Sequence, residues 1–371
     1  MFRLLSLLVV GVLLAACGRP EPWRQESYVF GTRVELAITG VPEAQARAAG
    51  NRVLRDFDYL HRTYHAWQPS ELSALNEAIA AGRTQEVSAE FAGYVREAQA
   101  IAAAGEHLFD PGIGRLIALW GFHTDEIRPQ LPDPAALKEL LAQHPSIDDL
   151  RVDGLRVSSR NRSVAIDFGG YLKGVALDRA AASLKQDGVA HALINIGGNV
   201  MALGNRDGAG TPWRIGIQHP RPQGVGGAPL ATLELKDGEA IGTSGDYHRF
   251  FEIGGRRYAH LLDPRTGFPA VGTQAVTVLI APGQSSGALR AWDSALCPAG
   301  TVSPCGTRAG MRSDALSKPI YVAGGEWRAM ARKLGVEAVL RVGADGTVSM
   351  TPAMQARVRI EAPDLKPEVV P

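Results

Sequence analysis

The segment from Ile241 to Gly267 combines groups that could bind an anion with a group that could move a proton. It opens with a predicted turn made of Thr243, Ser244, Gly245 and Asp246. Gly254 and Gly255 then interrupt an aromatic run, and a glycine pair supplies the positive φ angles of a two-residue hairpin turn. His260 follows the hairpin, so antiparallel pairing should return it to the end of the sheet where the turn lies. The hydroxyl and N–H groups there could hold phosphate oxygens, and a neutral histidine could accept a proton near neutral pH.

Other segments place glycines beside polar residues at the ends of predicted strands. They are Phe109-Asp110-Pro111-Gly112, Asp167-Phe168-Gly169-Gly170 with Lys173 after it, and Asn195-Ile196-Gly197-Gly198-Asn199. Glycine lets a ligand approach the backbone, whose N–H groups can bind phosphate oxygens. A dinucleotide is one natural ligand, but the turn at Gly169 lacks the G-x-G-x-x-G order of nicotinamide enzymes. A nicotinamide dehydrogenase is therefore disfavoured.

The elements that must position these groups indicate an α+β protein. Apolar residues recur at helical spacing over Ala44–Arg62, Ala89–Ala104 and Lys173–Lys185, and Gly105 stands where a left-handed helix cap is expected. Tyr28–Ile38 reads as the first strand, and β-rich runs separated by turn residues follow the third helix. Without a long linker or an internal repeat, we expect a single catalytic domain over residues 28–360 and a loose tail over 361–371.

Composition and the N-terminus restrict partners and compartment. The 371 residues carry a formal net charge of +1, which disfavours nucleic-acid binding by phosphate neutralisation. Residues 1–17 contain Arg3, an apolar run and Cys17, in the pattern of a bacterial lipoprotein signal that leaves Cys17 lipidated. An ordinary secretory peptide is the alternative, and residues 18–27 read as a tether. We expect an exported lipoprotein that is anchored to a membrane and faces the periplasm.

Export places the other two cysteines in an oxidising compartment. Cys297 and Cys305 lie close together in a Pro/Gly-rich loop, so we predict a disulfide between them. Zinc binding is the weaker alternative, because no second Cys or His pair stands at ligand spacing.

A series of segments resembles the FAD:protein FMN transferases, the ApbE-type lipoproteins, in the order of that family. They are FGT at 30–32, WQPSELSALN at 67–76, FDPGIGRLIALWGF at 109–122, DFGGYLKGVALDR at 167–179, NIGGN at 195–199, TSGDYHRFFEIGGRRYAHLLDPRTGFP at 243–269 and SDALS at 313–317. The resemblance implies two lobes of helices and antiparallel sheets around a central FAD cleft. It also implies that a Thr or Ser hydroxyl of a target protein attacks the FMN phosphorus of FAD with Mg²⁺ assistance and releases AMP.

The resemblance assigns roles by position. His260 would be the general base. The flavin or adenine pocket would be lined by Phe30, Trp67, Asp110, Pro111, Gly112 and Leu262. Asp167 and Lys173 would contact FAD. The residues Thr243, Ser244, Gly245 and Asp246 would either donate to phosphate oxygens or merely close a turn. The Gly170 carbonyl and Asp314 would face the metal.

The predicted metal loop departs from the family pattern. That pattern is Asp-Ala-x-x-Thr, whereas this chain has Lys318 at the Thr position, and a protonated lysine cannot ligate a cation. Either Asp314 and Gly170 hold Mg²⁺ with extra waters, or Lys318 supplies the positive charge and metal dependence weakens. Asp293 and Ser294 form a less favoured second copy of the loop, separated from the first by an apparent insertion over about 284–311. Gly112 also replaces a common Thr, which would remove a hydroxyl from the flavin pocket.

Two other functions compete with transfer. One is an envelope lipoprotein that binds or hydrolyses FAD without labelling a protein, and the other is a purely structural lipoprotein. For a transferase, the implied partner is a target flavoprotein of a membrane electron-transfer complex or a periplasmic reductase.

Overall fold

The computed structural model describes residues 21–124, 126–221, 228–283, 308–361 and 365–371. Its centre is a nine-stranded sheet in the order β1-β2-β6-β7-β10-β15-β16-β17-β19, antiparallel except for the β17–β19 pair. The strands are β1 (Trp23–Val29), β2 (Thr32–Thr39), β6 (His191–Ile196), β7 (Asn199–Leu203), β10 (Ala240–Gly245), β15 (Thr273–Ile280), β16 (Ala338–Gly343), β17 (Val348–Met350) and β19 (Glu368–Val369). The predicted α+β class is confirmed.

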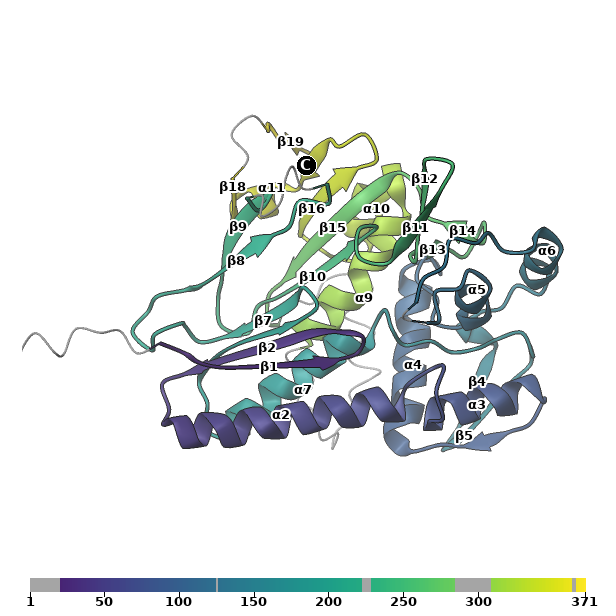
Figure 1. Ribbon diagram of the computed structural model, residues 1–371, viewed down its shortest axis with the longest axis horizontal. Coiled ribbons are helices and arrows are strands. Elements are labelled where there is room, and N and C mark those ends of the chain that lie inside the picture. Colours follow the sequence, from purple (N-terminus) through teal and green to yellow (C-terminus); the bar gives the residue numbers. More distant parts are fainter. Residues whose placement is uncertain (1–20, 125, 222–227, 284–307, 362–364) are drawn as a thin grey trace, which may run out of the picture.

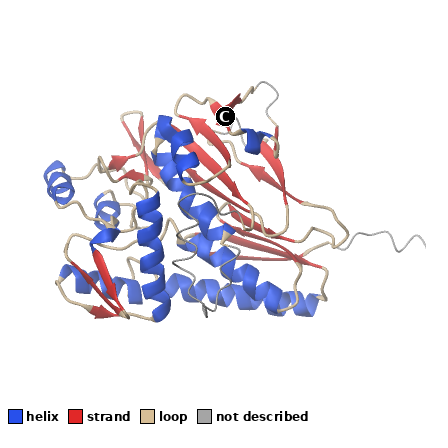
Figure 2. Ribbon diagram, turned by 180° about the vertical axis from the view of Figure 1, so that it is seen from behind, coloured by secondary structure: helices blue, strands red, loops and turns tan. Residues whose placement is uncertain are grey.

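Both faces of the sheet are covered (Figures 1 and 2). One face packs against four helices: α2 (Glu43–Thr63), α7 (Leu172–Gln186), α9 (Ala309–Val322) and α10 (Trp327–Lys333). The other face packs against a small sheet of β8 (Trp213–Ile217), β9 (Ala231–Leu235) and β18 (Val358–Ile360), with α11 (Pro352–Gln355) beside it. Alternate residues of β2 therefore enter different cores: Leu36 and Ile38 face the helices, and Ala37 faces the small sheet.

A second lobe lies at one end of the main sheet (Figure 1). Its helices are α3 (Glu71–Ala80), α4 (Ala89–Ala104), α5 (Gly114–Leu119) and α6 (Pro134–Ala142), and a small sheet is formed by β3 (Gln85–Glu86), β4 (Leu150–Asp153) and β5 (Arg156–Ser159). The hairpin of β11 (Phe250–Ile253) and β12 (Arg256–Ala259) and the pair β13 (Leu262–Asp263) and β14 (Phe268–Pro269) pack here through an aromatic core around Trp120. Gly254 and Gly255 have φ of 58° and 77°, so the predicted hairpin turn is confirmed.

The helices α7 and α9 cap each other. Asp178 on α7 accepts from the N–H groups of Gly310 (2.9 Å) and Met311 (2.8 Å) in the first turn of α9. Asp314 on α9 accepts from the Gly174 N–H (2.9 Å) in the first turn of α7. Carboxylates at helix N-termini satisfy unpaired N–H groups and stabilise the helix dipole. A Cβ on Gly174 would lie 2.5 Å from the Gly310 carbonyl oxygen, so only glycine allows this approach.

Two predicted boundaries were wrong. The tether of residues 18–27 overlaps β1, which begins at Trp23 because that ring packs against Gly50 of α2 and the strand alternates between half-buried and exposed residues. The tail of residues 361–371 contains β19, which pairs with β17. Most of the predicted insertion over about 284–311 lies outside the described residues, which resume at Arg308 just before α9.

The three predicted long helices are confirmed as α2, α4 and α7, but the role of Gly105 was wrong. Its φ is −89°, and its glycine is explained by Pro319, whose Cβ would lie 3.1 Å from an added Cβ. Among the described residues, none of the helices has both the length and the hydropathy needed to cross a bilayer.

Candidate functional site

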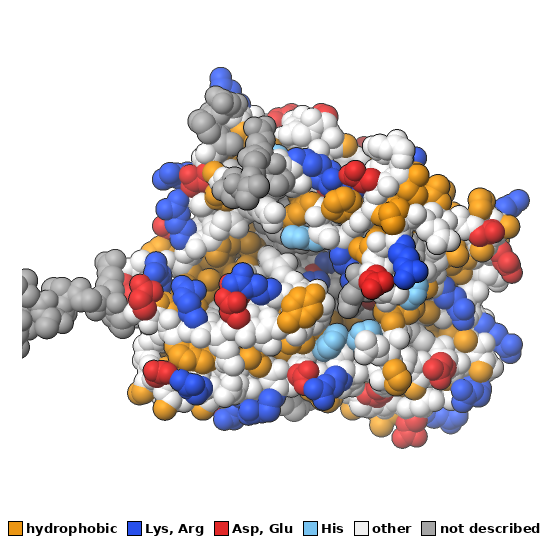
Figure 3. Space-filling view, viewed as in Figure 1, with side chains coloured by type: hydrophobic (Ala, Val, Ile, Leu, Met, Phe, Trp, Pro, Cys, Tyr) orange, Lys and Arg blue, Asp and Glu red, His pale blue; other side chains and the backbone are white. Residues whose placement is uncertain are grey.

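A cleft opens between the β1–β2 turn, the N-terminus of α7 and the second lobe. Its volume is about 230 Å³. Its lining includes Phe30, His61, His65, Trp67, Phe122, His123, Asp167, Lys173 and Arg249. Figure 3 shows histidine side chains around a hollow near the middle of this face. Aromatic rings beside two cationic side chains suit a ligand that has a flat ring system and an anionic part.

Trp67, Asp167 and Lys173, which the resemblance assigns to the FAD site, lie together in the cleft. The Trp67 indole N–H donates to Asp167 Oδ2 (3.2 Å), and the Gly169 N–H donates to Oδ1 (2.6 Å). Lys173 donates to the Gly169 carbonyl oxygen (3.1 Å), which places its ammonium at the start of α7. The glycine turn thus orients a carboxylate and an ammonium toward one space, where they can recognise a polar ligand. Phe30 contributes a ring that lies edge-on to His61, with ring centres 5.8 Å apart.

The Asp110-Pro111-Gly112 turn supports the cleft from outside. Asp110 is buried and uses both carboxylate oxygens within the protein, accepting from the N–H groups of Gly112 and Ile147 and from Ser146 Oγ. A Cβ on Gly112 would lie 2.4 Å from the Ile147 nitrogen, so the glycine is required by packing. The Pro111 carbonyl accepts from the Asp167 N–H (2.9 Å), and this bond fixes the backbone of the loop that carries Asp167.

His260 adjoins two residues that line the cleft. Its Nδ1 lies 3.2 Å from the Arg249 carbonyl oxygen, and its ring centre lies 6.4 Å from that of Phe122. Because a carbonyl can only accept, Nδ1 carries the proton, and the lone pair of a neutral imidazole stays on Nε2. Burial, with Arg249 and Lys173 nearby, lowers the pKa of His260 to about 3. The residue is therefore neutral at pH 7, as a proton acceptor must be.

The predicted turn from Thr243 to Asp246 was wrong, because Thr243–Gly245 is the last part of strand β10. The side chains consequently alternate between the two faces of the sheet. Ser244 Oγ lies 2.7 Å from Ser317 Oγ on α9, whereas Thr243 faces a second pocket. Asp246 accepts from both terminal nitrogens of Arg221, at 2.7 and 2.6 Å, and a carboxylate held in this way offers no donor to a phosphate.

Leu262 lies in the aromatic core of the second lobe. It is 6% exposed and belongs to the same cluster as Trp120 and Tyr258. Its contribution to a ligand site, implied by the resemblance, is therefore confined to packing behind the cleft.

The predicted metal residues meet at the contact between α7 and α9. Lys318 Nζ donates to Asp314 Oδ1 and to the Asp314 carbonyl oxygen, both at 2.7 Å, and the side chains are 10% and 1% exposed. An added Cβ on Gly170 would lie 2.8 Å from Lys318 Cε, so the lysine crosses directly over this glycine. Burial alone would raise the pKa of Asp314, but Lys318 and Lys173 lower it below its usual value.

This arrangement does not fit a Mg²⁺ site. Mg²⁺ requires oxygen ligands at about 2.0–2.1 Å in octahedral geometry. Here an ammonium contacts one carboxylate oxygen of Asp314, and the Gly174 N–H occupies the other. The described residues contain no group of three or more His, Cys, Asp or Glu side chains that could hold a metal. Of the two alternatives predicted for Lys318, the geometry favours the one in which the lysine supplies the charge.

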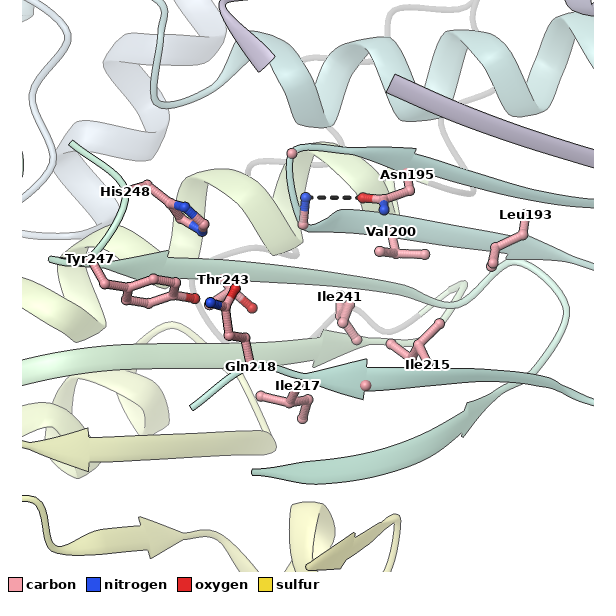
Figure 4. A pocket seen from close by; sticks show the side chains of 13 residues that line it. Leu193, Asn195, Val200, Ile215, Ile217, Gln218, Ile241, Thr243, Tyr247 and His248 are labelled. Atoms are coloured by element: carbon pink, nitrogen blue, oxygen red, sulfur yellow. Dashed lines mark hydrogen bonds between the residues drawn. The ribbon is translucent and has the colours of Figure 1, made fainter. Parts of the chain in front are cut away.

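A second pocket lies between β8 and the ends of β6, β7 and β10 (Figure 4). Ile215 and Ile217 of β8 face it together with Leu193, Val200 and Ile241, and Tyr247 and His248 border one end. In the described part of the chain β8 pairs with β9 alone, so its other edge has unpaired backbone groups. Burial and the nearby Lys173, which lines the cleft, lower the pKa of His248.

Comparison with known proteins agrees with this geometry. The model of the ApbE family matches residues 30–301. The chain belongs to the ApbE family. It is 40% identical over 363 residues to the FAD:protein FMN transferase of Rhodobacter capsulatus, which covers 96% of this chain and 63% of the relative. It is 31% identical over 234 residues to that of Haemophilus influenzae, covering 62% of this chain and 66% of the relative. It therefore spans slightly less than two thirds of the length of these two relatives.

The ApbE protein of Thermotoga maritima has a similar solved structure. Its TM-score is 0.75 at 28% identity, and the alignment covers 91% of this chain and 100% of that chain. The flavin transferase ApbE of Vibrio cholerae, at 24% identity and a TM-score of 0.72, shares the fold.

Several cleft residues of this ApbE family member escaped sequence reasoning. They are His61, His65, Phe122, His123 and Arg249. The histidines stand near a helix end or in a loop without a recognisable motif, so nothing in the sequence distinguishes them from surface residues. Arg249 had a signal, because it lies in the segment that carries His260. Cys17, Asp293, Ser294, Cys297 and Cys305 lie outside the described residues.

Proposed function

We propose that this chain transfers FMN from FAD to a Thr or Ser hydroxyl of a target flavoprotein and releases AMP. The observation that carries the proposal is the cleft, in which Trp67, Asp167 and Lys173 converge beside a neutral His260. Aromatic residues would contact the flavin or adenine ring, and the ammonium of Lys173 would bind pyrophosphate oxygens. Membership in the ApbE family and the names of the relatives support the same reaction.

The reaction requires one proton acceptor. The acceptor oxygen attacks the FMN-side phosphorus of FAD, the bond from that phosphorus to the bridging oxygen breaks, and AMP leaves with that oxygen. Nε2 of His260 takes the hydroxyl proton, while the bond from Nδ1 to the Arg249 carbonyl keeps the ring in the required tautomer. Phosphoryl transfer needs mainly positioning and cationic charge around the pyrophosphate. The resemblance implies Mg²⁺ as the source of that charge, but the residues around Asp314 do not fit this ion.

The test is to incubate the purified protein with FAD and an acceptor flavoprotein that carries the target Thr. Flavin fluorescence that remains on the acceptor in a denaturing gel, with one AMP released per FMN transferred, is the expected result. AMP and FMN without labelling would instead indicate FAD hydrolysis. Retained FAD without turnover would indicate a flavin carrier, and either outcome refutes transfer.

We further propose that the acceptor polypeptide binds as an extended strand along the unpaired edge of β8. A sheet edge gives main-chain hydrogen bonds to such a segment, and the pocket beside it accepts alternate side chains. Leu193→Glu should raise the KM for the acceptor without changing the Kd for FAD. Leu155→Glu, at a turn residue that is 43% exposed in the second lobe, is the control. Equal KM values for the two variants would contradict this docking site.

Export and anchoring are also part of the proposal. The signal-like residues 1–17 support lipidation of Cys17, and an anchored enzyme would face periplasmic reductases or a membrane electron-transfer complex as acceptors. A Cys17→Ser variant should leave the membrane fraction while the unaltered chain stays in it. An unchanged distribution would contradict the anchor.

A further inference from the structure

A buried ammonium lies next to the proposed pyrophosphate site. Lys318 is 10% exposed, and two of its three N–H groups donate to Asp314, one to the carboxylate and one to the backbone carbonyl. Within the described part of the chain, the third N–H has no protein acceptor. A buried ammonium normally satisfies its donors, so the remaining one is available to a ligand.

The position of this ammonium is set by two helices. Asp314 and Lys318 are one turn apart on α9, and Asp314 is itself held by the Gly174 N–H at the start of α7. The lysine stem crosses over Gly170, in the glycine turn that also carries Asp167 and Lys173. The ammonium is therefore anchored by packing and by a charged hydrogen bond, and it needs no rearrangement to act.

The negative charge of FAD also favours a binding site beside the Lys318 ammonium. FAD carries two negative charges on its pyrophosphate, and the departing AMP gains a further one as the bond breaks. Lys173 supplies one cation on the open side of the cleft. Lys318 supplies a second one on the buried side, where a low dielectric strengthens its attraction for phosphate oxygens. A divalent ion here would be repelled by the ammonium and would have to displace it from Asp314.

We propose that Lys318 is a resident cation that takes the place of a divalent metal, so that this chain binds FAD and transfers FMN without Mg²⁺. The inference rests on the proposed function, since it concerns the same pyrophosphate. Lys318 contacts the FMN-side phosphate through its remaining N–H and stabilises the charge that develops on AMP. Asp314 acts as a positioning residue for the ammonium.

The first test is FAD binding to the full chain, followed by flavin fluorescence quenching, in EDTA and in millimolar Mg²⁺. The expected Kd for FAD is the same in both within about twofold, and calorimetry should detect no Mg²⁺ binding to the unliganded protein. A Kd that tightens on the order of tenfold with Mg²⁺ would overturn the inference. This measurement needs no variant and no acceptor protein.

The second test is Lys318→Thr, which restores a hydroxyl one turn after Asp314. In EDTA its Kd for FAD should rise by on the order of tenfold to hundredfold, and Mg²⁺ should restore most of the loss. Lys185→Thr, at an exposed position of α7, should bind FAD like the unaltered chain. If Lys318→Thr retains full affinity in EDTA, Lys318 is not the cation. If Lys318→Thr fails to fold, the Kd values for FAD of the unaltered chain in EDTA and in Mg²⁺ still test whether FAD binding needs the metal.

The two proposals fail in different ways. FAD binding that is independent of Mg²⁺, but without labelling of any acceptor, would refute FMN transfer and leave the resident cation intact. Labelling that requires Mg²⁺ would refute the resident cation and leave FMN transfer intact.

Discussion

Replacing Gly174 by Ala should destabilise the protein although alanine is the better helix former. The added Cβ would lie 2.5 Å from the Gly310 carbonyl oxygen, 2.6 Å from Met311 Cα and 2.7 Å from Asp314 Cβ. Two of these atoms belong to the backbone and cannot rotate away. Overpacking costs about 1–3 kcal/mol, and contacts this short justify the upper end. The gain in helix propensity is about 1 kcal/mol, which leaves a net loss of about 2 kcal/mol.

Gly93→Ala is the matched control. Gly93 also lies within a helix, α4, but an added Cβ there would meet no atom within 4 Å. It should stabilise the protein by about 1 kcal/mol, so the two variants should differ by about 3 kcal/mol. Urea unfolding followed by circular dichroism measures the difference as opposite shifts of the midpoint. If Gly174→Ala unfolds at the same urea concentration as Gly93→Ala, the close contact between α7 and α9 is not a constraint.

The remaining predictions concern the cleft. His260→Gln removes the proton acceptor, so it should lower kcat by about 10²–10⁴-fold with little change in the Kd for FAD. Single-turnover labelling measures the rate, and an unchanged kcat would exclude His260 as the base. Since the pKa of His260 is lowered to about 3, the acid limb of kcat/KM for the unaltered chain should lie below pH ~6.5, and a limb at or above that pH would contradict it. Because the pKa values of His260 and His248 are lowered in the folded chain, each of these two residues makes the free energy of unfolding fall as the pH drops below about 6.5. His260→Gln lacks one of these contributions, so it should lose less stability than the unaltered chain over the same drop in pH. Trp67→Phe should weaken FAD binding by about three- to tenfold by removing the donor to Asp167, and an unchanged Kd would show that this bond does not orient the carboxylate.

Sequence reasoning succeeded where a local rule determines the structure. Gly254 and Gly255 adopt positive φ angles at low energy, so between two aromatic strands they predict a hairpin turn. The helical spacing of apolar residues predicted α2, α4 and α7. Asp167 and Lys173 were assigned to the FAD site by the resemblance, and they lie close together because both belong to the short segment around the glycine turn before α7.

It failed where distant partners determine the outcome. Asp246 was predicted to lie at a phosphate site, but it forms an ion pair with Arg221. The small residues of β10 were predicted to form a turn, whereas they are small because α9 packs closely against this strand at Gly242. The polar strand β1 was mistaken for a tether, since the partner that buries half of it is α2. Lys318 was recognised as unusual, but its alternatives could be separated only when its distance to Asp314 was known.

The crossed caps between α7 and α9 also have a consequence for how the chain folds. The two bonds join residues that are 140 and 132 positions apart, so the helix pair closes a long loop. Closing such a loop costs conformational entropy, and the contacts between α7 and α9 stabilise the fold only when their free energy exceeds that cost. A nascent chain that has made α7 but not yet α9 lacks the ammonium at the cleft. Flavin capture is thereby tied to completion of the chain, and a fragment that ends before residue 309 should not bind FAD.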